Sequence, residues 1–112
     1  MKTSELTGPA LDWAVAKADG LPVHAPDWNN RFIDAYNYST DWAKGGPIIE
    51  REGISLKFFE YDRPSYWGAV KPVPGTSCRT SGCSGPTPLI AAMRCYVASK
   101  LGDEVEVPEE LR

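Results

Sequence analysis

The sequence predicts an α+β fold, in which two helices pack on a small antiparallel sheet of about three strands and long loops connect the elements. An almost wholly apolar segment near the carboxyl end has capping residues at both ends, and short β-branched and aromatic runs alternate with turn residues in the middle. The 112 residues suit a single domain, 1–112, ending in an acidic extension at 103–112. Ten prolines and ten glycines indicate long irregular connections.

The first helix is expected between Thr7, which can cap it, and Gly20, with a proline in its first turn. Asp12 and Asp19 are expected to point away from its apolar stripe, and Trp13 also lies off that stripe. Trp13 either packs under a loop or belongs to an oligomer interface. The stripe follows the helical repeat through Leu11, Ala14, Val15 and Ala18.

The middle of the chain is expected to form the sheet. Residues 21–42 read as a long loop that its aromatic side chains anchor to the core. A hairpin is then predicted from residues 48–51 and 54–59, after a Gly-Gly-Pro turn, and residues 66–70 supply a third strand. The segment 76–86 is expected to be a polar loop.

The last helix is expected to start after Thr87 as its cap, with Pro88 in the first position, and to stop at Gly102. Apart from Arg94, its hydrophilic residues lie in the final turn. Because a helix that is apolar nearly all round is covered on more than one face, its large residues should meet the sheet. Its small residues should then meet the first helix or a partner subunit.

The charge distribution excludes some partners. The net charge is −3, but without the last ten residues 11 bases and 10 acids remain, so no basic patch for duplex nucleic acid is expected. No apolar run is long enough to span a membrane, and the first residues do not resemble a signal peptide. The sequence therefore predicts a soluble intracellular protein.

Three blocks of the sequence resemble the NinX-like family of small accessory proteins of lambda-like bacteriophages and prophages: residues 2–20, 38–56 and 85–111. The resemblance covers well over half of the chain. It implies a protein made in the cytoplasm of an infected bacterial host, and it supplies no mechanism. The loop 73–84 looks particular to this chain.

The amino-terminal end of the last helix is the first candidate site. Ser84, Gly85 and Thr87 place hydroxyls and a flexible backbone at a helix start, where free N–H groups favour an anion such as phosphate. Arg94 is the best lone cation for that anion. The alternatives are an ordinary capped helix and a salt bridge from Arg94 to a carboxylate.

The second candidate site is the segment Ser39, Thr40, Asp41 and Trp42, followed by Gly46. A Trp face beside an acceptor and two hydroxyls can form a wall for a base or sugar, and Gly46 lets the backbone approach a ligand. The same residues can instead form a capped turn with a core Trp at the entrance of the hairpin.

No metal site or cofactor is expected. A four-ligand site would need Cys78, Cys83, Cys95 and His24, the single histidine, to converge. Cys95 is more simply a small core residue. Catalysis is poorly supported, because nucleophilic chemistry needs an oriented base. No catalytic residue is predicted.

Two functions follow as hypotheses. The first is a noncatalytic protein that binds a small anionic, nucleotide-like ligand between the two candidate segments, so as to counter host signalling. The second is a protein interaction factor that docks on a host or phage enzyme through Trp13, Trp28 and other aromatics. The identity of the ligand or partner and the oligomeric state, including a homodimer, stay open.

Overall fold

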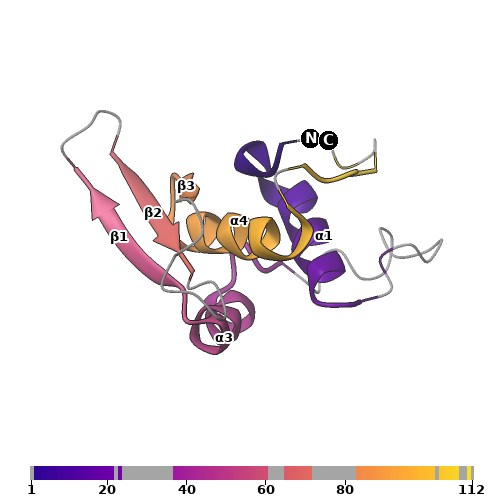
Figure 1. Ribbon diagram of the computed structural model, residues 1–112, viewed down its shortest axis with the longest axis horizontal. Helices are drawn as coiled ribbons and strands as arrows, with labels where there is room; N and C mark the ends of the chain where they lie inside the picture. The colour runs from indigo at the N-terminus through magenta and orange to yellow at the C-terminus, as the bar shows by residue number, and fades with distance from the viewer. Residues whose placement is uncertain are drawn as a thin grey trace.

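Helix α4, Pro88–Leu101, is the central element of the computed structural model, which describes residues 2–21, 23, 37–60, 65–71, 83–102, 104–108 and 111. In Figure 1, α4 lies between the sheet on one side and helix α1, Gly8–Ala18, on the other, and helix α3, Trp42–Glu52, packs against it from below. The predicted α+β fold is confirmed, with a third helix and the short 3-10 turn Thr3–Glu5 added.

The predicted ends of α4 are confirmed. The Thr87 hydroxyl accepts a hydrogen bond from the backbone N–H of Ile90 at 3.1 Å, Pro88 follows in the first turn, and Gly102 ends the helix. The helix is buried along most of its length, at Leu89 and at every position from Ala91 to Val97. Its neighbours on several sides are α1, α3 and the sheet, as its nearly continuous apolar surface requires.

Helix α1 is more deeply buried than its apolar stripe suggests. Trp13 is 1 % exposed and belongs to the core, so of its two predicted roles the structure shows packing inside the domain. The expectation that Asp12 points away is wrong: it is 6 % exposed, and its carboxylate accepts a hydrogen bond from the Ser39 backbone N–H at 2.8 Å. This bond explains how a carboxylate can sit inside a largely apolar helix.

The strand predicted at residues 48–51 is wrong, because this segment lies in α3. The Asp41 side chain caps the helix by accepting from the Ala43 N–H, and Gly53 ends it in the left-handed region at φ 67°. Gly45 faces Leu89 of α4 so closely that a Cβ there would lie 2.5 Å from a Leu89 methyl carbon. The Gly-Gly-Pro sequence therefore permits close helix packing rather than a turn.

The sheet has three antiparallel strands in the order β1-β2-β3. Strands β1, Ser55–Phe59, and β2, Tyr66–Val70, pair as predicted, with Lys57 opposite Gly68. The third strand is β3, Cys83–Gly85, which pairs with β2, so the expectation of a loop throughout 76–86 is wrong at these residues. Residues 76–82 of that loop, like most of 21–42, lie outside the described residues.

The acidic extension returns to the start of the chain. Lys2 and Glu104 form an isolated antiparallel bridge, and the two termini lie together in Figure 1. Val105 and Val107 are buried, at 4 % and 2 % exposed. Within the described residues, no helix is both long and apolar enough to cross a membrane.

Candidate functional site

The sheet has an inner face that packs on α4 and an outer face that carries an aromatic pair. Side chains alternate along each strand, so the register places one set of residues together on the outer face. Buried Ala69 and Gly85 belong to the opposite, inner set. The outer set is Ser55, Lys57, Phe59, Tyr66, Gly68, Val70 and Ser84.

Phe59 and Tyr66 are directly opposite each other on β1 and β2, and their rings stack with centroids 5.1 Å apart and planes 15° apart. The Phe59 ring leans over Gly68, where a Cβ would lie 2.7 Å from a ring carbon. The Lys57 ammonium lies over the same ring, 5.3 Å from its centroid. Two aromatic rings, a cation and a glycine without a side chain therefore lie together on the outer face of the sheet.

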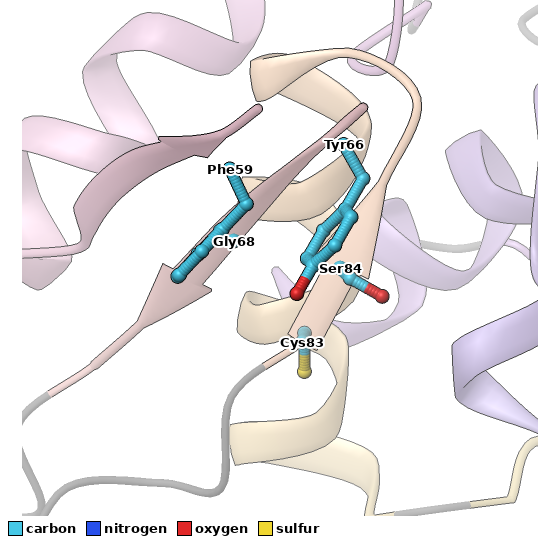
Figure 2. Close-up of a pocket in the computed structure, with 5 residues that line it drawn as sticks. All are labelled: Phe59, Tyr66, Gly68, Cys83 and Ser84. Carbon is cyan, nitrogen blue, oxygen red and sulfur yellow. The ribbon is translucent and has the colours of Figure 1, made fainter. Parts of the chain in front are cut away.

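A pocket of about 340 Å³ opens beside this pair, lined by Phe59, Tyr66, Gly68, Cys83 and Ser84. Figure 2 shows the two rings next to each other, with Ser84 and Cys83 along β3 close to Tyr66. A second pocket, of about 300 Å³, also includes Phe59 and Gly68. Its remaining lining comes from Ser55, Leu56, Lys57, Ala69 and Val70.

The predicted Trp42 segment meets the start of α4 at a separate pocket of about 260 Å³. Ser39, Thr40, Trp42 and Thr87 all line it, together with Pro88, Leu89 and Ile90. Trp42 is 52 % exposed, so it is not the core anchor of the alternative interpretation. Both Asp41 and Thr87 use side-chain oxygens to cap helices here.

The other predicted site residues lie elsewhere. Gly46 is in α3 and does not line this pocket, Ser84 lines the sheet pocket, and Gly85 is buried against α4. Arg94 donates hydrogen bonds to the backbone carbonyls of Leu6 at 2.8 Å and of Ser84 at 2.7 Å. It thus ties the start of the chain to β3 through backbone carbonyls rather than through a salt bridge. Burial lowers the pKa of the Arg94 guanidinium.

Charged side chains gather instead at the end of α3. Glu52 Oε1 lies 2.9 Å from Lys71 Nζ, and Glu52 Oε2 lies 3.0 Å from Arg51 Nε. The hydrogen bond from Lys71 is the main reason that the pKa of Glu52 lies below its usual range. Arg51 also contacts Asp19 at 3.0 Å.

The cysteines lie in different parts of the chain. Cys95 is buried in α4, as expected, and Cys83 begins β3 and lines the sheet pocket. Cys78 and His24 lie outside the described residues. Within the described part of the chain, no group of three His, Cys, Asp or Glu side chains could hold a metal ion.

Sequence reasoning missed Lys57, Phe59, Tyr66 and Gly68. The signal was present in the alternation of residues 55–59, but its meaning depends on which strand lies opposite. Phe58 and Phe59 point to opposite faces because they are adjacent on a strand, but the sequence does not show which ring meets Trp67 and which meets Tyr66.

A sequence model described as "Bacteriophage P22, NinX" matches residues 2–100. The chain belongs to this family. The predicted resemblance is thereby confirmed, and membership of the NinX family supports a phage accessory protein. No curated protein matches the chain.

Proposed function

We propose that this phage accessory protein is a noncatalytic binding protein for a small, anionic, nucleotide-like ligand in the cytoplasm of the bacterial host. The ligand binds on the outer face of the sheet, against the Phe59–Tyr66 pair. The observation that carries the proposal is the stacked pair over Gly68, with Lys57 on one side and a pocket beside Ser84 on the other.

The chemistry of this face suits a base and a phosphate. Stacking on an aromatic side chain contributes about 1–3 kcal/mol per base, and it tolerates any base because each has a π face. Lys57 supplies a positive charge for a phosphate. The Ser84 hydroxyl, which lines the pocket, can make a polar contact at its rim.

The Trp42 pocket is less suited to an anion. Its lining residues include no cation, and the Thr87 hydroxyl is engaged by the Ile90 N–H. Pro88 brings no N–H to the helix start. Arg94, the cation predicted for that site, bonds to two backbone carbonyls instead. An anionic ligand therefore finds better charge complementarity on the sheet.

The test is isothermal titration of the purified full chain with nucleoside mono- and diphosphates, using Phe59→Ala and the matched control Phe58→Ala. Phe58 is the neighbouring residue on the opposite face, and it is 44 % exposed. Loss of one stacking surface should weaken binding at least about tenfold in Phe59→Ala. Phe58→Ala should bind as the wild type does. Absence of binding at millimolar concentration, or equal losses in both variants, overturns the proposal.

A second candidate function, docking on a host or phage protein, is favoured by the exposure of Trp42 beside its pocket. Exposed Trp residues next to a hollow are frequent hot spots of protein interfaces. Trp13 is buried and cannot serve in this way, and Trp28 lies outside the described residues. Affinity capture from infected cells should return a stoichiometric partner that Trp42→Ala loses and Phe59→Ala retains.

A further inference from the structure

We infer that the ligand is a dinucleotide, with its two bases in the two pockets that flank Phe59 and its single phosphodiester at Lys57. This inference rests on the proposed function and specifies its ligand. It starts from the observation that both pockets are lined by Phe59 and Gly68. The aromatic ring therefore stands at a boundary between two hollows on one continuous surface.

The two pockets differ in the rest of their lining. On the β3 side, Tyr66 offers a ring and Ser84 a hydroxyl. On the β1 side, Ser55 and Val70 line the hollow around Lys57. At about 340 and 300 Å³, each pocket lies at the lower end of the range for small-molecule sites, roughly 300–1,000 Å³. Each suits a single base with its sugar, and a ligand that fills both must carry two such groups.

The charge on this surface selects the length of the ligand. Among the residues lining the two pockets, Lys57 is the one cation. One ammonium matches the one phosphodiester that joins two nucleosides. A longer strand would bring further phosphates, each of which needs its own cation to gain affinity by counterion release.

A linked pair of bases should bind more tightly than separate ones. After the first base is stacked, the second is held close to its pocket at a high effective concentration. Binding of the dinucleotide should therefore exceed that of a mononucleotide without any contact beyond those that each base makes alone. The gain depends on both pockets being open.

The experiment compares adenosine monophosphate, the dinucleotide ApA and a hexa-adenylate by isothermal titration with the full chain. We expect one ApA per chain, bound at least about tenfold more tightly than adenosine monophosphate. The affinity of the hexanucleotide should exceed that of ApA by less than tenfold. For one neutralised phosphate, the logarithm of the ApA affinity should fall with the logarithm of salt concentration with a slope of about −0.7. Lys57→Gln should abolish that slope.

A variant that fills one pocket separates this inference from the proposed function. Val70→Phe, on the outer face of β2, should fill the pocket on the Lys57 side. It should remove the advantage of ApA over adenosine monophosphate. If the wild type binds the monophosphate without preferring ApA, or prefers the hexanucleotide by tenfold or more, the dinucleotide inference is overturned and the proposed function stands. If no nucleotide binds, both fail.

Discussion

Each face of the sheet carries an aromatic pair, Phe58–Trp67 on the inner face and Phe59–Tyr66 on the outer face, but on the inner face small residues also pack closely against α4. On the inner face, Ala69 is 1 % exposed and Gly85 lies directly against the backbone of α4. On the outer face, Phe59 and Tyr66 are half-buried and contact each other rather than the core. Large rings that stay outside the core contribute less to folding than buried ones do. The difference indicates that the inner face holds the fold together and that the outer face is free to bind.

The strongest way to test this contrast is to compare truncations in the two regions. Met93 in α4 is 0 % exposed, so Met93→Ala should leave a cavity and lower the free energy of unfolding by about 2–5 kcal/mol. Phe59→Ala removes more atoms but should cost less, about 1 kcal/mol, since the ring is only partly buried and its main partner is one other ring.

Urea denaturation of the two variants measures both quantities, and nucleotide titration supplies the second readout. A matched loss of stability in Phe59→Ala would mean that the outer pair is a second core, and the contrast between the faces would fail. Retained stability with lost ligand binding would sharpen it.

Two glycines in neighbouring strands test the contrast with the same substitution. In Gly85→Ala, the new methyl would lie 2.9 Å from the Ala91 backbone nitrogen, which cannot move without shifting α4. We expect a loss of about 1–3 kcal/mol in the free energy of unfolding. In Gly68→Ala, the methyl would meet the Phe59 ring, a side chain that can rotate outward.

Gly68→Ala should therefore leave stability nearly unchanged but displace Phe59 and weaken nucleotide binding. Thermal unfolding and titration of the two variants are the measurements. Equal destabilisation by both substitutions would show that the outer face is as tightly packed as the inner one.

The sequence predicts helix α4 well and the site on the outer face of the sheet poorly, for a physical reason. The ends of α4 depend on local chemistry, a Thr–Pro start and a glycine stop, which the chain carries within a few residues. The outer site depends on register between β1, β2 and β3, and β3 arrives from more than ten residues away along the chain. Such long-range pairing leaves no local signature.

The error at α3 has a different origin. Its Gly-Gly-Pro sequence breaks most helices, and Ile48 and Ile49 favour strands, so local propensity pointed to a hairpin. Tertiary contact reversed that preference, because Gly45 allows α3 to approach Leu89 and Ile48 is buried. Arg94 was similarly assigned to an anion because its partners, the carbonyls of Leu6 and Ser84, are distant in sequence.

A smaller effect is expected at the ion pairs that join α3 to the residue after β2. Glu52→Gln removes the carboxylate that pairs with Lys71, whose side chain is 10 % exposed, and should lower the free energy of unfolding by about 1–2 kcal/mol at neutral pH. The pKa of Glu52 is lowered in the folded chain, so its contribution is present above its ordinary pKa and is lost as the pH falls through the folded value.

Urea denaturation at several pH values should show the wild type and Glu52→Gln converging in acid. A constant difference between them would contradict an ionic origin. Nucleotide binding should be the same in both proteins, since Glu52 lines neither pocket on the outer face.

The smallest effect, with the opposite sign, is expected at Asp12. Burial raises the pKa of its carboxyl above the ordinary value, although the hydrogen bonds with Ser39 oppose this shift. The folded chain therefore binds the proton more tightly than the unfolded chain does, and the stability that protonation adds is fully present below the unfolded pKa and lost as the pH rises through the folded one. Asp12→Asn keeps an oxygen to accept from the Ser39 N–H without a charge to bury. As the solution is acidified, the wild type should accordingly gain stability relative to Asp12→Asn. Over the same change in pH it should lose stability relative to Glu52→Gln. If the two differences in stability change in the same direction with pH, Asp12 does not titrate as a buried acid, and its surroundings in α1 are more open to water than their packing indicates.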